Sequence, residues 1–119
     1  MEEKDKYLFF FGGNYGEVVI EGGTFTSNGG YGLNNQSTGK MTISNAEIIG
    51  GIYNIGELTV NSGSVYQHLS GRHAVYNWTG KVVINGGAFD SESGNELILA
   101  DGTNASVVIN DGTFDKTAK

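Results

Sequence analysis

The chain has 119 residues, of which 20 are glycine and none is proline or cysteine. Its net charge of −6 argues against nucleic acid and anionic membrane surfaces as partners, because both attract clustered lysine and arginine. The lack of cysteine excludes disulfides and thiolate metal sites, and no apolar run is long enough to cross a membrane.

In chain order, the sequence begins with six mostly charged residues (MEEKDK), which we interpret as a leader outside the fold. The apolar run that follows, Tyr7–Phe11, is too short for the core of a signal peptide. We expect residues 7–114 to form one domain and residues 115–119 to form a C-terminal tail.

The rest of the chain is organised by a repeat. Five ten-residue blocks align without gaps, namely Gly16–Phe25, Gly39–Ile48, Gly56–Val65, Gly80–Phe89 and Ala105–Phe114. Their starts are separated by 23, 17, 24 and 25 residues. A period of about 22 residues with variable length is typical of a β-helix whose coils carry loops of different size.

Each block has the same internal pattern. The third and fifth positions are apolar, as in Val18 and Ile20, which predicts a strand with one buried face. The seventh and eighth positions are mostly Gly, Asn, Ser or Asp, which tolerate the left-handed conformation of a tight corner. The tenth position is apolar again and begins a second strand.

A third short strand is expected before each block. The triplets are Phe9–Phe11, Gly32–Asn34, Ile52–Asn54, Val75–Asn77 and Ile98–Ala100. We therefore predict an all-β fold, a single-stranded parallel β-helix of about five coils with three short strands per coil. An antiparallel β-sandwich is the alternative, but it does not require the same corner residues in five successive units.

Two strings carry a resemblance to known proteins. IYNIGELTVNSGSV (residues 52–65) and AVYNWTGKVVINGGAF (residues 74–89) resemble right-handed parallel β-helix repeats of the pectate-lyase-like kind. They are most similar to the repeats of large surface proteins from gut-type anaerobic bacteria. The likeness covers roughly residues 7–114 and consists of corner and core residues. It implies right-handed winding, as does the crossover rule, and a cell-surface or extracellular location with the export signal outside this sequence.

Stacking the coils turns columns of the alignment into ladders. We expect an interior amide ladder of Asn34, Asn54 and Asn77. A second column, outside, alternates in charge through Glu17, Lys40, Glu57, Lys81 and Ser106. A third column, Val19, Thr42, Thr59, Val83 and Val108, is either a docking stripe or a set of good strand formers.

Loops between the same two strands should project from one edge of the prism, where loops often carry function. Those loops are Ser27–Tyr31, Gln67–His73 and Ser91–Asn95. The candidate ligand-binding residues in and next to these loops are Tyr31, Tyr66, His68, Arg72 and His73, which offer ring faces and hydrogen-bond donors. Trp78 lies at another corner, as a packing residue or as an exposed platform for a sugar.

Reactive clusters are sparse in the sequence. Asp90, Glu92, Glu96 and Asp101 are the carboxylates that a glycoside hydrolase would need to bring together. His68 and His73 lack an obvious third metal ligand. We expect no catalytic residue, no metal site and no cofactor.

We therefore expect a non-enzymatic solenoid segment of a bacterial surface or secreted protein, a stalk or adhesion module with weak carbohydrate binding. A glycan or a host surface protein would be its partner. The alternatives are a fragment of a carbohydrate-active β-helix whose catalytic part lies elsewhere, and a structural solenoid that associates end to end through unpaired strands.

Overall fold

The computed structural model describes residues 13–27, 30–92 and 96–116, and every regular element in these ranges is a β-strand. Sheet I contains β1 (Glu17–Glu21), β4 (Lys40–Ser44), β7 (Glu57–Val60), β10 (Lys81–Ile84) and β13 (Ser106–Ile109). Sheet II contains β2 (Thr24–Thr26), β5 (Ala46–Ile49), β8 (Gly63–Gln67), β11 (Ala88–Ser91) and β14 (Thr113–Lys116). Sheet III contains β3 (Leu33–Asn35), β6 (Ile52–Asn54), β9 (Val75–Trp78) and β12 (Ile98–Asp101).

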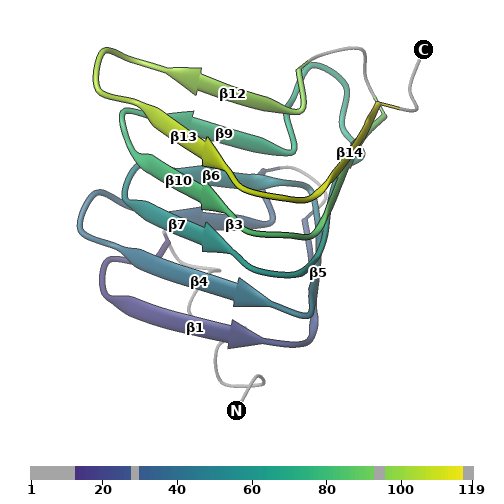
Figure 1. The fold of residues 1–119 in the computed structure, drawn as a ribbon, viewed down its shortest axis with the longest axis horizontal. Coiled ribbons are helices and arrows are strands. Elements are labelled where there is room, and N and C mark those ends of the chain that lie inside the picture. Colours follow the sequence, from purple (N-terminus) through teal and green to yellow (C-terminus); the bar gives the residue numbers. More distant parts are fainter. Residues whose placement is uncertain (1–12, 28–29, 93–95, 117–119) are drawn as a thin grey trace.

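All neighbouring strands in the three sheets run parallel, and each strand pairs with its copy one turn away. The predicted parallel β-solenoid with three strands per turn is therefore confirmed (Figure 1). The chain rises from its N-terminus to its C-terminus as a right-handed coil (Figure 1). The described strands make four complete turns and two further strands, and the predicted strand Phe9–Phe11 lies outside the described residues.

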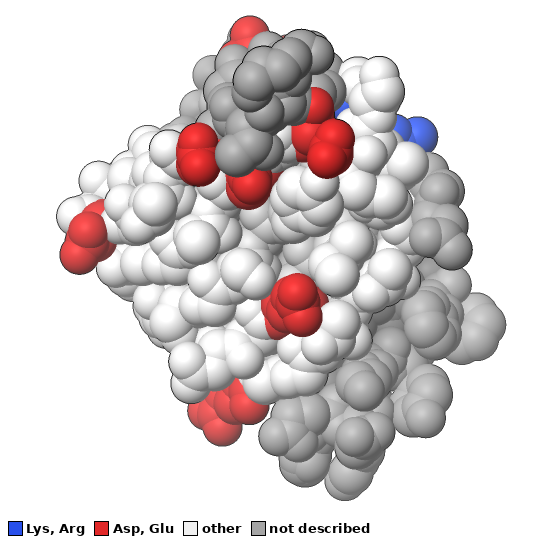
Figure 2. All heavy atoms as spheres, turned by 90° about the vertical axis from the view of Figure 1, so that its right-hand side faces the viewer, with Lys and Arg blue, Asp and Glu red and all other residues white. Residues whose placement is uncertain are grey.

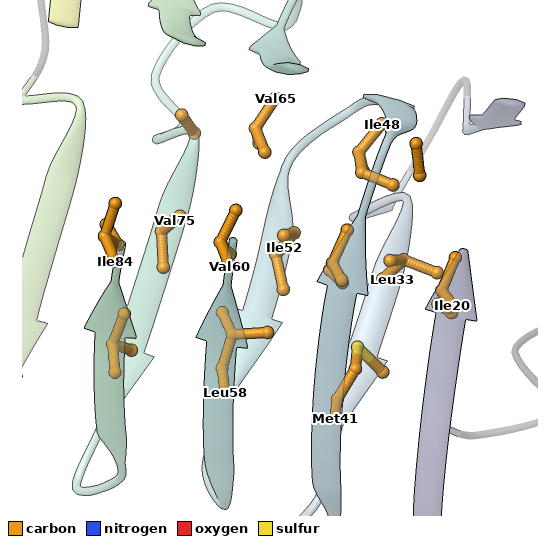
Figure 3. Packing of buried hydrophobic residues seen from close by; sticks show 14 of the residues in the cluster. Ile20, Leu33, Met41, Ile48, Ile52, Leu58, Val60, Val65, Val75 and Ile84 are labelled. Carbon is orange, nitrogen blue, oxygen red and sulfur yellow. The ribbon is translucent and has the colours of Figure 1, made fainter. Parts of the chain in front are cut away.

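The core is a set of apolar columns that run along the axis of the coil. In sheet I, Ile20, Ile43, Val60 and Ile84 stack in register and are at most 1% exposed. Sheets II and III add equivalent columns, so that side chains from three sides meet on the axis (Figure 3). Fully burying a side chain of this size contributes about 1.5–3 kcal/mol, which makes the apolar stack the main stabilising term.

The corners between sheets I and II follow the predicted chemistry. Asn45, Gly63, Gly87 and Gly112 all have positive φ there. At Gly63 a Cβ atom would overlap the carbonyl oxygen of Ala46 in the turn below, so a side chain does not fit at this position. Positive φ favours glycine at Gly63, Gly87 and Gly112, whereas in the second turn Asn45 takes the positive φ and Ala46 follows it.

An interior asparagine ladder runs beside the apolar columns, but its register differs from the prediction. Asn35, and not Asn34, donates from Nδ2 to Oδ1 of Asn54 at 2.8 Å, and Asn54 donates to Asn77 at 2.9 Å. Asn14 extends the ladder by donating to Asn35 at 3.0 Å. Asn34 instead pairs with Tyr53 on the outer face of sheet III. The correction follows from strand alternation: Leu33 is buried, so the residue two positions later must also point inward.

The outer columns of sheet I have the predicted register, with Lys40 between Glu17 and Glu57. The last turn differs from all the others. Ile109 and Phe114 occupy core columns and are 51% and 37% exposed, and β13 and β14 are the last described strands of their sheets. Their counterparts in the first turn, Ile20 and Phe25, are 0% and 6% exposed.

Candidate ligand-binding site

The candidate site lies where sheet II passes into sheet III, at a corner where one turn of the solenoid has no loop. Strands β5 and β6 are joined by Gly50 and Gly51 alone, which both have positive φ. The turns on either side carry longer connections at this corner, residues 27–32 and 68–74. The two loops close over the short corner, and the Arg72 guanidinium lies 5.5 Å from the centre of the Tyr31 ring.

Two further tyrosines lie beside Tyr31 on the outer face of sheet III. Tyr53 of β6 and Tyr76 of β9 are register partners, with ring centres 5.4 Å apart and planes at 78°. The Tyr31 ring is 5.8 Å from that of Tyr53 and 6.3 Å from that of Tyr76. Aromatic pairs at these separations attract one another, so the three rings form a defined cluster.

The cluster borders a surface hollow of about 600 Å³, which we name the tyrosine hollow. It is lined by Gly30, Tyr31, Asn34, Tyr53, Gly71, Arg72, His73, Tyr76 and Leu99. At both Gly30 and Gly71 a Cβ atom would meet nothing within 4 Å, so the rim of the hollow is open there. The volume is within the range of small-molecule sites, and the lining combines ring faces with a few polar groups, as such sites usually do.

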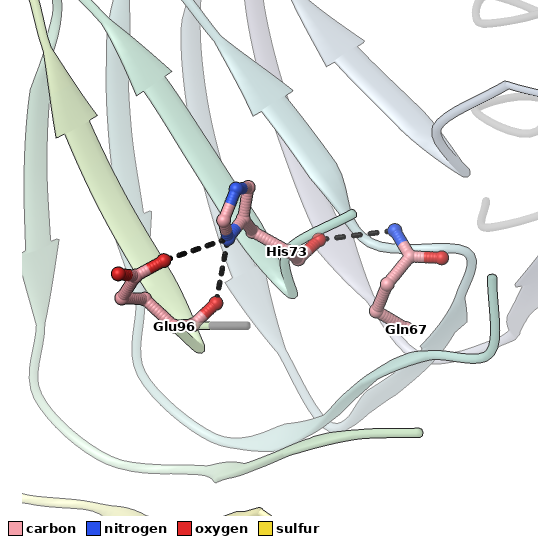
Figure 4. A network of polar contacts seen from close by, with 3 residues as sticks. All are labelled: Gln67, His73 and Glu96. Carbon is pink, nitrogen blue, oxygen red and sulfur yellow. Dashed lines mark hydrogen bonds and ion pairs between the residues drawn. The ribbon is translucent and has the colours of Figure 1, made fainter. Parts of the chain in front are cut away.

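Hydrogen bonds hold the Arg72 loop in place at both ends (Figure 4). The buried Gln67 side chain donates from Nε2 to the carbonyl oxygens of Gly50 (2.7 Å) and His73 (3.0 Å). Its Oε1 accepts from the backbone N–H of Leu69 at 2.9 Å. One internal glutamine therefore ties the start of the loop to its end and to the short corner.

His73 continues this network toward the next turn. Its Nδ1 lies 2.6 Å from the carbonyl oxygen of Glu96 and 3.9 Å from the Glu96 carboxylate (Figure 4). A carbonyl oxygen can only accept, so Nδ1 carries the proton in this contact. The ring packs edge-on against Tyr76, with centres 6.0 Å apart. This fixes the orientation of a side chain that lines the hollow.

The pKa values of two tyrosine hydroxyls in the hollow, Tyr31 and Tyr76, are raised, which favours their neutral forms. Burial raises the pKa of Tyr31, although a hydrogen bond from the His73 backbone and the charge of Arg72 offset part of the rise. The hydrogen bond from the Tyr76 hydroxyl to Asp101 Oδ2 (3.1 Å) and the negative charge of Asp101 raise the pKa of Tyr76, together with burial. The hollow therefore offers neutral hydroxyls beside one permanent positive charge.

The structure brings together only some of the residues that the sequence suggested. Tyr31, Arg72 and His73 line the hollow, whereas Tyr66 lies on sheet II and donates its hydroxyl hydrogen to Glu92 at 2.8 Å. His68 is outside the lining, and its buried Nδ1 has no hydrogen-bond partner among the described residues.

Trp78 lies at the other end of sheet III and is 46% exposed. It pairs with Asp101 of the next turn and is followed by Thr79, whose φ is +62°. A β-branched residue rarely adopts this conformation. The column of Trp78 continues through Ile55 to Gln36, one position after the interior asparagines.

Tyr53 and Tyr76 were not among the site residues predicted from the sequence. A signal was present: each precedes an interior asparagine, so alternation places each on the outer face, one turn apart. The candidates predicted from the sequence were in or near loops and corners, whereas strands β6 and β9 supply two of the three rings.

The candidate catalytic carboxylates are divided between two sides of the solenoid. Asp90 lies in β11 of sheet II, and Glu92 follows the end of that strand. Glu96 contacts His73, and Asp101 contacts Tyr76. The face formed by sheet II carries several carboxylates, and basic side chains show only at its edge (Figure 2). In the described ranges, no three His, Cys, Asp or Glu residues come close enough to hold a metal ion.

No protein-family model, curated protein or solved structure matches this chain. Among the described residues, no helix is long and apolar enough to cross a membrane.

Proposed function

We propose that this chain is a non-enzymatic binding module that holds an oligosaccharide in the tyrosine hollow. One observation carries the proposal: three tyrosine rings, an arginine and a histidine from three different turns border one open hollow of about 600 Å³. Loops positioned by a rigid scaffold are a common place for binding sites.

The chemistry of the lining suits a sugar. A sugar ring presents C–H groups on its faces, which pack on aromatic rings, and hydroxyls on its edge, which need donors and acceptors. Tyr53 and Tyr76 supply the faces, because they project from adjacent strands of a rigid sheet. Arg72 and Asn34 supply hydrogen-bonding groups around them. Because the hydrogen bonds of Gln67 hold the Arg72 loop in place, the loop loses less conformational entropy when a ligand binds.

We extend the proposal to the setting of the protein, a stalk or adhesion segment of a bacterial surface or secreted protein. The repeat strings that resemble surface-protein β-helices support it, as does the parallel solenoid itself. The separation of the candidate carboxylates between two sheets favours binding over hydrolysis.

The proposal is tested by screening the chain on a glycan array and titrating the best glycan by calorimetry. Replacing both Tyr53 and Tyr76 by Ala should raise the dissociation constant about tenfold or more, because tenfold corresponds to about 1.4 kcal/mol and two packed rings are lost. Arg72→Ala should also weaken binding.

Two tyrosines outside the hollow provide matched controls. Tyr15→Ala and Tyr66→Ala should leave the affinity unchanged, since Tyr15 is exposed elsewhere and Tyr66 lies on sheet II. Equal losses in the control and hollow variants would contradict the proposed site. Release of reducing or unsaturated sugars that stops on substitution of Asp90 or Glu92 would instead favour the enzymatic alternative.

A further inference from the structure

Trp78 lies on the same outer face of sheet III as two tyrosines of the hollow. Side chains two residues apart in a strand point to the same side, so Tyr76 and Trp78 of β9 both face outward, on either side of the buried Asn77. Their Cα atoms are about 6.6 Å apart along the strand. Trp78 is outside the lining of the tyrosine hollow, so it extends this aromatic surface beyond the hollow.

The exposure of Trp78 belongs to the middle of the sheet. Strand β9 lies between β6 and β12, so described strands pair with both of its edges. With both neighbours in place, the side chain is still 46% exposed. The indole ring is therefore accessible whatever covers the first and last turns.

The next turn borders one edge of the indole. Thr79 follows Trp78 with positive φ, and its N–H donates to the Asp101 carbonyl at 2.9 Å. Gly102 has the equivalent place one turn later, also with positive φ. A Cβ atom at Gly102 would lie 2.7 Å from Thr79 Cγ2 and 3.5 Å from Trp78 Cδ1. Glycine at this place thus leaves room for the indole and keeps it beside the backbone of the next turn.

Asp101 lies next to both aromatic rings. It is the register partner of Trp78 in β12, and its Oδ2 accepts the hydroxyl hydrogen of Tyr76 at 3.1 Å. A carboxylate has two acceptor oxygens, so Asp101 can also accept hydrogen bonds from ligand hydroxyls. The surface that leads from the hollow to Trp78 therefore combines ring faces with a hydrogen-bond acceptor.

We infer that Trp78 forms a second sugar subsite, at which a β-1,4-linked chain of glucose-type units packs on the indole where it leaves the tyrosine hollow along β9. This inference rests on the proposed function. Sugars of this configuration carry their ring substituents in equatorial positions, which leaves C–H groups on both faces to pack on aromatic rings. The β-1,4 linkage extends successive units into a flat ribbon, and Tyr76 and Trp78 follow one another on one face of a strand.

The test is calorimetric titration of cello-oligosaccharides of two to six glucose units against the wild type, Trp78→Ala and Tyr15→Ala. Tyr15 is the matched control, because it is 61% exposed in the same outer column as Trp78, three turns away. Trp78→Ala should raise the dissociation constant of cellotetraose and longer chains about tenfold, since one packed ring is lost. It should leave that of cellobiose unchanged, because the hollow alone holds two units, and this result also shows that the variant is folded. Tyr15→Ala should bind every chain like the wild type.

Fluorescence gives a direct readout, because Trp78 is the single tryptophan of the chain. Cellotetraose and longer chains should shift the emission of the wild type to shorter wavelength and protect the indole from quenching by acrylamide. Cellobiose should change neither property. A purely structural role of Trp78 would not produce this dependence on chain length.

The outcomes separate this inference from the function on which it rests. An equal loss for Trp78→Ala at all chain lengths, or an emission spectrum that no chain changes, would overturn the second subsite alone. Lack of cello-oligosaccharide binding, with another glycan bound in the hollow, would also overturn it and leave the proposed function in place. Unchanged affinity on replacing both Tyr53 and Tyr76 by Ala would contradict the proposed function, and the inference with it.

Discussion

At the scale of single residues, the interior asparagines show how one side chain can serve two turns. Asn54 is fully buried, donates to the Gly56 carbonyl and to Asn77, and accepts from Asn35. A buried amide with all its partners is stabilising, whereas removing one member leaves its neighbours without partners in an apolar interior.

We predict that Asn54→Ala lowers the free energy of unfolding by about 3 kcal/mol, because it removes a buried amide and orphans the donors and acceptors on both sides. Asn34→Ala is the matched control and should cost less than about 1 kcal/mol, because Asn34 faces outward. Urea unfolding of the two variants measures both values. A larger loss for Asn34→Ala would contradict the register described above.

The raised pKa of Tyr31 predicts a dependence of stability on alkaline pH. Burial favours the neutral hydroxyl, so the pKa in the folded state lies above the ordinary value of 10.0. The resulting stabilisation is fully present below pH 10.0 and is lost as the pH rises through the folded-state pKa. The free energy of unfolding of the wild type should therefore fall, relative to that of Tyr31→Phe, as the pH rises above 10.0. Urea titrations of both proteins at neutral and alkaline pH measure this, and a constant difference would argue against burial of the hydroxyl.

At the scale of elements, the strand register was the most predictable feature of the chain. Three apolar or glycine positions recur in each block, and a slip by one residue would expose the whole apolar face. The blocks of sheet I and the corners therefore align as expected. The short strands of sheet III have a weaker alternation of apolar and polar residues. Either Asn34 or Asn35 could occupy the interior position, and the buried Leu33 two residues before Asn35 identifies Asn35.

Pairing in sheet I leads to a prediction about charge. Lys40 has Glu17 and Glu57 as its two register neighbours. Lys40→Glu places three like charges in one exposed column, and it should lower the free energy of unfolding by about 0.5–1 kcal/mol. The loss should be smaller at high salt, because salt screens exposed charges. Lys40→Gln provides the control without the added negative charge, and a loss that salt leaves unchanged would contradict an electrostatic origin.

At the scale of the whole molecule, the solenoid could be predicted from the sequence, but the hollow could be predicted only in part. The expectation that long loops gather at one edge holds for Tyr31 and Arg72, which meet across the short corner at Gly50–Gly51. It does not hold for Tyr66, which belongs to strand β8 and faces outward from sheet II. Whether a residue ends a strand or begins a loop decides which side it faces, and a shift of one position at that boundary reverses the answer.

The near-regular spacing of the turns has a consequence for folding. Each strand pairs with a strand one repeat away, so successive turns close chain segments of similar length, and closure entropy changes only slowly with that length. The entropy cost of forming each turn is therefore similar. Folding can begin in any pair of adjacent turns and extend from there in both directions. The hollow draws on the loops of the turns on either side of the short one, with Tyr53 from the short turn between them. A ligand bound in the hollow would contact three consecutive turns at once. These turns would then unfold together, and not one after another from one end of the solenoid.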